Sequence, residues 1–73
     1  MADRFFLKDS NGNVCAQKKM PQHIKAFLDD KGISDTEKYT VESEFTGYIL
    51  EVTSKTTLEE WRAYAEKCLL ALD

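Results

Sequence analysis

Apolar and polar side chains alternate one by one through residues 39–53, on both sides of the turn signal Thr46-Gly47. This two-residue period is typical of strands with one buried face, and a two-residue loop that contains glycine joins two such strands into a hairpin. The pattern therefore predicts a hairpin that pairs Val41 with Val52. Its buried face would carry Tyr39, Val41, Phe45, Tyr48, Leu50 and Val52.

The opposite face of this hairpin would carry polar side chains and one isoleucine, namely Thr40, Glu42, Glu44, Ile49, Glu51 and Thr53. In the predicted register Glu42 and Glu51 stand directly opposite each other, where like charges destabilise a sheet. Antiparallel sheets commonly leave one face in water. The acidic face is therefore either a solvated surface or the binding surface for a partner with basic side chains.

A second turn signal, Asn11-Gly12, separates two more short segments with strand character. Asn-Gly favours a type I′ turn, which requires positive φ at both central residues. Counting outward from this turn pairs Leu7 with Ala16. The predicted buried face consists of Phe5, Leu7, Val14 and Ala16, and the other face of Phe6, Lys8, Cys15 and Gln17.

Two segments have the 3.6-residue apolar period of amphipathic helices. Pro21 suits the first position of one helix, since its missing N–H costs nothing there, and Gly32 suits its end. The apolar side chains of this helix are Met20, Ile24, Phe27 and Leu28. Thr57 and Glu60 have capping-box spacing at the start of the other helix. Its apolar stripe comprises Leu58, Trp61, Ala65, Cys68, Leu69 and Leu72, with Tyr64 and Leu70 off the stripe.

The elements follow one another in the order β-β-α-β-β-α within a single compact domain, residues 1–73. An isolated hairpin is marginally stable in water, so the two hairpins should combine. We therefore predict an α+β fold with one four-stranded antiparallel sheet and two helices packed on one face. The other face stays open unless a partner covers it.

Few side chains are candidates for catalysis. The chain has one histidine, His23, and two cysteines, Cys15 and Cys68, with no local motif that joins them. Paired catalytic carboxylates need a cleft and a raised pKa, and an open sheet face supplies neither. We therefore expect a protein that is not an enzyme and has no cofactor or metal site. Cys68 should be a small core side chain, and Cys15 should be accessible.

Charge is distributed unevenly along the chain, whose net charge is −3. Residues 1–33 hold six basic and four acidic side chains (+2), and residues 34–73 hold four basic and nine acidic ones (−5). Such asymmetry can guide association with a charged partner. Without a signal peptide or an 18-residue apolar run, we expect a cytoplasmic protein with reduced thiols and no membrane contact.

Small size, an acidic half and the lack of a catalytic constellation favour a non-enzymatic protein-binding module or inhibitor. The predicted partner-binding residues are Glu42, Glu44, Tyr48, Ile49 and Glu51. One concrete form of this hypothesis is a phage-encoded, anti-CRISPR-like inhibitor that covers a basic surface of a host defence or nucleic-acid-binding enzyme. Four apolar residues lie outside the predicted core, namely Phe6, Ile49, Tyr64 and Leu70. They indicate either an imperfect register or a contact surface, of which a homodimer is the simplest use.

The alternative is a small nucleic-acid-binding protein that uses Phe6, Lys8, Lys18 and Lys19. An aromatic ring beside basic side chains can stack on a base while the ammonium groups contact phosphate. The net negative charge and the lack of a glycine-rich phosphate loop argue against this reading. Nucleic acid is therefore the less favoured partner.

Overall fold

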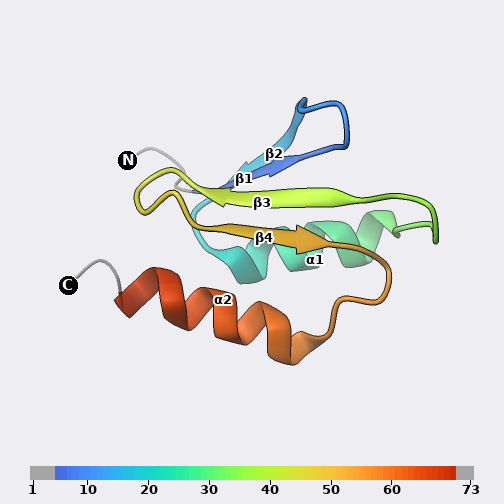
Figure 1. Cartoon of the computed structure of the whole chain (residues 1–73). Coiled ribbons are helices and arrows are strands. Elements are labelled where there is room, and N and C mark those ends of the chain that lie inside the picture. The colour runs from blue at the N-terminus through green and yellow to red at the C-terminus, as the bar shows by residue number, and fades with distance from the viewer. Residues whose placement is uncertain (1–4, 71–73) are drawn as a thin grey trace.

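The computed structural model describes the backbone of residues 5–70 and the side chains of residues 5–68. Its elements are β1 (Phe5–Lys8), β2 (Val14–Lys18), α1 (Pro21–Lys31), β3 (Tyr39–Ser43), β4 (Ile49–Val52) and α2 (Leu58–Leu70). The strands form one antiparallel sheet in the order β2-β1-β3-β4. Both helices lie on the same side of this sheet (Figure 1). The predicted α+β fold is therefore confirmed.

The two hairpins join through β1 and β3, which form the centre of the sheet. Leu7 lies opposite Val41, and both side chains are completely buried on the helix side. Phe6 lies opposite Glu42 in the adjacent pair. Because successive residues of a strand point to opposite faces, Phe6 and Glu42 share the open face. The edges of the sheet are β2 and β4.

The first hairpin has a three-residue loop, Ser10 to Gly12, in place of the predicted two-residue turn. The Asp9 N–H donates to Asn13 O (2.9 Å), and the Gly12 N–H donates to Asp9 O (3.0 Å). Only Gly12 has positive φ here (+86°), which excludes a type I′ turn. The Asp9 carboxylate explains the difference, because it accepts hydrogen bonds from the N–H groups of Asn11 and Asn13, both at 2.9 Å.

A β-bulge in β2 absorbs the extra loop residue. Leu7 pairs with Ala16 as predicted, but Lys8 pairs with Val14, which leaves Cys15 without a partner on β1. The prediction that Val14 lies on the buried face is wrong: its side chain is 47% exposed.

The second hairpin has a four-residue loop, Glu44 to Gly47. The Ser43 N–H donates to Tyr48 O (3.0 Å) and the Gly47 N–H donates to Ser43 O (2.9 Å). The Ser43 hydroxyl accepts a further bond from the Thr46 N–H (3.1 Å), so the serine side chain organises the wider loop. These bonds move the strands by two residues from the predicted register.

Val41 therefore pairs with Leu50, and the predicted Val41–Val52 pair is wrong. A two-residue shift preserves the face on which each strand residue lies, because the side-chain period is two. Glu42 faces Ile49 in this register, and Glu51 faces Thr40. The direct opposition of two carboxylates that the sequence predicts is thus avoided.

Helix α1 begins at Pro21 and buries Ile24 and Leu28 against the sheet. It ends at Gly32, whose φ of +85° favours glycine, and the Gly32 N–H donates to Leu28 O (2.7 Å). Helix α2 begins with the predicted capping box. The Thr57 N–H donates to Glu60 Oε1 (3.0 Å), and the Glu60 N–H donates to Thr57 Oγ1 (3.2 Å).

The buried side of α2 differs from the predicted stripe. Trp61, Tyr64 and Cys68 are buried, whereas Leu58 is 50% exposed. The placement of Tyr64 off the stripe is therefore wrong, and the expectation that Cys68 is a core residue is confirmed. The predictions for Leu69, Leu70 and Leu72 lie outside the described side chains.

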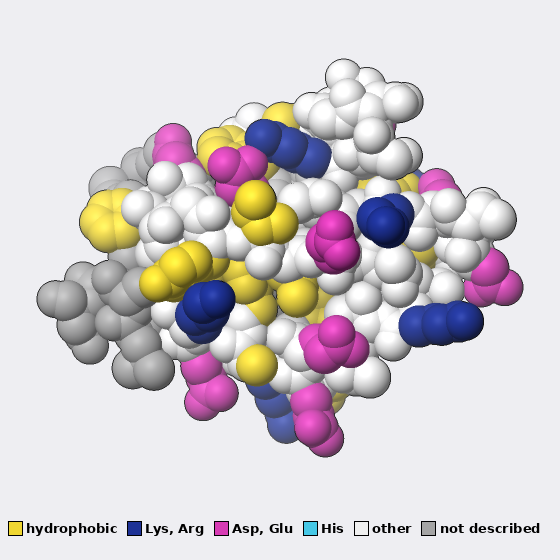
Figure 2. Space-filling model, in the orientation of Figure 1, with side chains coloured by type: hydrophobic (Ala, Val, Ile, Leu, Met, Phe, Trp, Pro, Cys, Tyr) yellow, Lys and Arg dark blue, Asp and Glu magenta, His cyan; other side chains and the backbone are white. Residues whose placement is uncertain are grey.

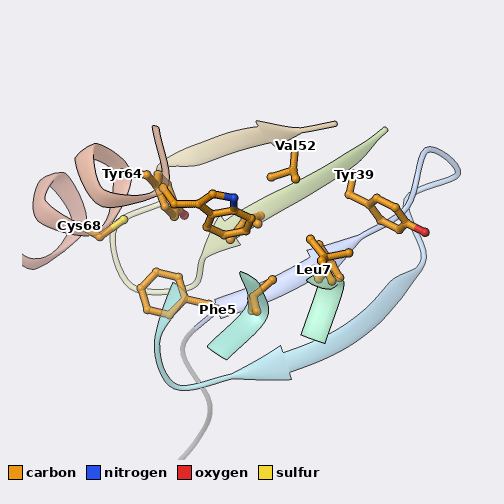
Figure 3. Close-up of a cluster of buried hydrophobic side chains, with 10 residues drawn as sticks. Phe5, Leu7, Tyr39, Val52, Tyr64 and Cys68 are labelled. Carbon is orange, nitrogen blue, oxygen red and sulfur yellow. The ribbon is translucent and has the colours of Figure 1, made fainter. Parts of the chain in front are cut away.

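Figure 3 shows core side chains from β1, β3, β4 and α2 that converge between the sheet and the helices. Tyr64 meets Phe5 edge to face, with the ring centroids 6.2 Å apart and the planes at 72°. The Tyr64 hydroxyl donates to Tyr48 O (2.8 Å), which satisfies its polar group inside the core. The complete core is Phe5, Leu7, Ile24, Leu28, Tyr39, Val41, Val52, Trp61, Tyr64 and Cys68.

Candidate functional site

The open face of the sheet is the candidate binding surface, and pairing arranges its side chains in two rows across the strands. We call it the open face throughout. One row runs from β2 to β4 through Gln17, Phe6, Glu42 and Ile49. The other row runs through Val14, Lys8, Thr40 and Glu51. Apolar, basic and acidic side chains are thus interspersed rather than segregated (Figure 2).

Lys8 and Glu42 form an ion pair at the centre of the open face. Lys8 Nζ lies 2.7 Å from Glu42 Oε1, and each side chain keeps about a third of its surface exposed (34% and 35%). A pair this exposed contributes about 0–1 kcal/mol to stability. Its larger effect is on recognition, because Lys8 neutralises one of the predicted acidic residues. Glu51 is the remaining exposed carboxylate in these rows.

Ile49 is the most exposed apolar side chain of the open face, at 59%. It lies directly across from Glu42, and Phe6, which is half-buried, follows on the other side of that glutamate. An exposed apolar side chain beside charged groups can supply apolar contact in a protein interface.

Two of the predicted partner-binding residues lie apart from the open face. Glu44 is exposed in the loop that precedes β4. Tyr48 closes that loop opposite Ser43, which is buried on the helix side, so the tyrosine points toward the helices. Lys67 Nζ lies 4.5 Å from the centroid of the Tyr48 ring. The structure therefore brings Glu42, Ile49 and Glu51 together and leaves the other two beside them.

Sequence reasoning did not assign Phe6 and Lys8 to the same surface as the glutamates. They join it because β1 pairs with β3, which places Phe6 beside Glu42 and Lys8 beside Thr40. The alternation of β1 already put Phe6 and Lys8 on one face. The missing information was the order of the strands, which local alternation does not specify.

The residues of the nucleic-acid alternative are divided between surfaces. Lys8 is paired with Glu42 on the open face. Lys18 pairs with Phe5, a core-facing residue, and Lys18 Nζ lies over the ring of Phe27 in α1, 5.8 Å from its centroid. Lys18 is therefore on the helix side and does not join Phe6 and Lys8 in one basic, aromatic surface.

The chain matches no family model, no curated protein and no solved structure in the comparisons. Functional inference consequently depends on the geometry of the site.

The shifted pKa values lie away from the open face. A hydrogen bond from the Ser34 N–H, and then one from the Tyr39 hydroxyl, lowers the pKa of Glu37. The hydrogen bond between Lys31 Nζ and the Tyr39 hydroxyl (2.7 Å) raises the pKa of Lys31. Burial is the main cause that raises the pKa of Tyr64. These groups hold the α1–β3 connection and the core, so their shifts are structural.

A hollow of about 210 Å³ lies between α1 and the segment that joins β4 to α2. Its polar side chains include Lys25 and Asp29, which are already paired at 2.8 Å. Neither thiol and no imidazole lines it. Cys15 is exposed, as expected, and Cys68 is buried.

Among the residues that the structure describes, no three His, Cys, Asp or Glu side chains gather in a way that could hold a metal ion. No described helix has both the length and the apolar character needed to cross a membrane.

Proposed function

We propose that this protein is a small binding module that docks a partner protein on the open face of its sheet. The observation that carries the proposal is Ile49, whose side chain is 59% exposed. It lies between carboxylates, on the sheet face that the helices do not cover. In a partner complex, Ile49 and Phe6 would supply the apolar centre, and Glu51 would supply the charged rim.

Charge on and beside this face favours a basic partner. Glu51 is exposed, and Glu44 adds a second exposed carboxylate in the neighbouring loop. The Lys8–Glu42 pair contributes no net charge, but it provides a donor and an acceptor in fixed positions. Charge complementarity of this kind mainly raises the association rate and excludes wrong partners. A partner that places a lysine or arginine opposite Glu51 and an apolar side chain over Ile49 would match the charge and the apolar area of this surface.

Such a complex gives the module an inhibitory role if the covered surface of the partner is its functional surface. Basic surfaces commonly bind nucleic acid through phosphate contacts, so an acidic module would compete with that ligand. The narrower hypothesis of a phage-encoded inhibitor of a host defence enzyme stays a prediction.

The test compares two double variants in affinity capture from the native cell. Ile49→Lys with Glu51→Lys removes the exposed apolar side chain and reverses a charge. The Ile49 substitution also places an ammonium group opposite Glu42, which favours folding. Reversal of Glu42 itself is avoided, because the new ammonium group would stand beside Lys8.

The matched control is Asp30→Lys with Glu66→Lys, two exposed acidic positions on α1 and α2. A protein counts as a partner only if the wild type and the control retain it and the open-face variant loses it. Folding of each variant is checked by circular dichroism and thermal unfolding. A partner that binds the open-face variant as well as the wild type would place the binding site elsewhere.

A further inference from the structure

The outer edge of β4 carries backbone groups that no strand among the described residues 5–70 pairs. Residues opposite each other in antiparallel strands alternate between pairs that exchange hydrogen bonds and pairs that do not. The Ser43 N–H donates to Tyr48 O, so the bonded pairs between β3 and β4 include Ser43–Tyr48 and Val41–Leu50. The N–H and C=O groups of Ile49 and Glu51 therefore point away from β3.

This open ladder has defined ends. On one side, the Gly47 N–H already donates to Ser43 O (2.9 Å) within the loop. On the other side, the Thr53 N–H donates to Thr56 Oγ1 (2.8 Å), and Thr53 O accepts the Thr56 N–H (3.2 Å). Four outward groups remain between these ends, two on Ile49 and two on Glu51.

The two edges of the sheet are protected to different degrees. The β2 edge has a bulge at Cys15 and ends at Lys18, and Lys19 follows directly. Bulges and lysines are the usual features that prevent a second strand from adding to an edge. Strand β4 has the sequence ILEV, with no lysine or proline, and its pairing with β3 has no register irregularity. The β4 edge is consequently the better template for strand addition.

Exposed apolar side chains are concentrated in one stretch of the sequence. Five large hydrophobic residues are exposed among the side chains that the structure describes, and four of them lie between residues 45 and 58. This segment comprises part of the β3–β4 loop, β4 and the start of α2. The four are Phe45, Tyr48, Ile49 and Leu58; Val14 is the fifth. Ile49 is the member of this set that lies on β4 itself.

We propose that a second copy of this chain adds to the β4 edge in antiparallel orientation, with the two-fold axis at Leu50. The outward groups lie on residues 49 and 51, symmetrically on either side of Leu50. A two-fold arrangement thus places Ile49 opposite the partner's Glu51, and Glu51 opposite the partner's Ile49. Each pair exchanges two hydrogen bonds, so all four outward groups of each copy are used. Because each copy uses the same surface in this interface, the assembly stops at two subunits.

Side chains support the same register. The two Leu50 side chains meet on the helix side, where a pair without mutual hydrogen bonds brings side chains close together. Leu50 is only partly buried in one chain, so this contact removes further apolar surface from water. On the open face, Ile49 packs on the aliphatic part of the partner's Glu51. The dimer extends the sheet to eight strands and leaves both open faces accessible.

This inference goes beyond the proposed function and does not depend on it, because the isolated full chain is sufficient for the test. The contact is short, so a weak dimer is expected, with Kd between about 10 μM and 1 mM. Sedimentation equilibrium over this concentration range should show an average mass that rises from one chain toward two. Amide hydrogen exchange should slow at Ile49 and Glu51 as concentration rises.

The variant Glu51→Pro removes one outward N–H and places the proline ring on the edge. Proline is tolerated on an edge strand when its nitrogen faces away from the sheet, so the bonds between β3 and β4 remain. We expect the dimer to weaken at least about tenfold. Gln17→Pro is the matched control, because the same alternation directs the Gln17 N–H outward on β2. It should leave the dimer unchanged.

Two readouts keep the proposal open to refutation even if a proline variant fails to fold. A wild-type chain that stays monomeric up to about 1 mM would overturn it. A dimer whose Ile49 and Glu51 amides exchange at a rate independent of concentration would also overturn it, since pairing would then occur elsewhere. Dimer loss in Gln17→Pro with retention in Glu51→Pro would assign the contact to β2.

Discussion

Tyr64→Phe tests how the core holds the loop before β4. The substitution keeps the ring and its edge-to-face contact with Phe5 at 6.2 Å. It removes the hydroxyl that donates to Tyr48 O at 2.8 Å. A hydrogen bond of this kind contributes about 0.5–1.5 kcal/mol net. Because Tyr48 O also accepts the Ser43 N–H, no buried acceptor is left unpaired, and we expect about 0.5–1 kcal/mol of destabilisation at pH 7.

The same variant has a predicted pH dependence with a definite sign. Burial raises the pKa of Tyr64 above its usual value of 10.0, so the folded state keeps its proton where the unfolded state loses it. The contribution of Tyr64 to stability is therefore complete below about pH 10 and declines above it. Phenylalanine does not titrate. The stability advantage of the wild type over Tyr64→Phe should shrink or reverse as pH rises beyond 10.

The assay is urea unfolding at pH 7 and at pH 10.5, followed by the fluorescence of the buried Trp61. In a separate thermal scan at pH 7, the expected loss lowers Tm by about 2–8 °C for a domain of this size. A stability difference between the two proteins that is the same at both pH values would refute the reasoning about burial. A loss above about 3 kcal/mol at pH 7 would show that the substitution disturbs packing as well as one hydrogen bond.

Two further predictions concern the connections between elements. Thr57→Ala removes the acceptor for the Glu60 N–H at the start of α2. Thermal unfolding should show a loss of stability of about 1 kcal/mol for Thr57→Ala and a smaller loss for Thr57→Ser. Equal stability of the two variants would mean that the cap contributes nothing. Hydrogen bonds from Ser34 and Tyr39 lower the pKa of Glu37 below 4.5, so its contribution is present above pH 4.5 and disappears as pH falls through the folded-state pKa. Wild type and Glu37→Gln should therefore converge in stability in acid unfolding titrations, and a difference that widens toward low pH would contradict this.

The sequence was sufficient to predict which residues of β3 and β4 lie on each face of the sheet. The alternation of apolar and polar side chains gives the same faces even when the predicted register is wrong by two residues. The loop between β3 and β4 is wider than predicted, since the Ser43 hydroxyl bonds the Thr46 N–H. The resulting shift by two residues changes every pair and no face. Ile49 and Glu51 consequently lie on the open face, as predicted, although Ile49 faces Glu42 rather than Glu44.

The first hairpin shows the opposite outcome. There the Asp9 carboxylate selects a three-residue loop, and the odd insertion creates a bulge that moves Val14 out of the core. The error at Tyr64 has another origin. A tyrosine is easily assigned to the surface, and only the tertiary structure supplies the Tyr48 carbonyl that allows its burial.

The composition of the candidate site depended on strand order, which the sequence does not contain. Lys8 and Glu42 are 34 residues apart, and only β1–β3 pairing brings them to 2.7 Å. The acidic face predicted from one hairpin is for this reason a mixed face in the sheet. Ile49 is predicted from the sequence as a partner-binding residue, and the structure adds Phe6 and Lys8 to the same face.

The most direct test of docking on the open face is an NMR titration of the labelled protein with its partner. That partner is the protein that the wild type and the control variant retain and the open-face variant loses. The account predicts amide shifts and cross-saturation at Phe6, Lys8, Thr40, Glu42 and Ile49, with Asp30 and Glu66 on the helices unaffected. Cross-saturation concentrated on α1 and α2, with the β1, β3 and β4 amides unchanged, would contradict it.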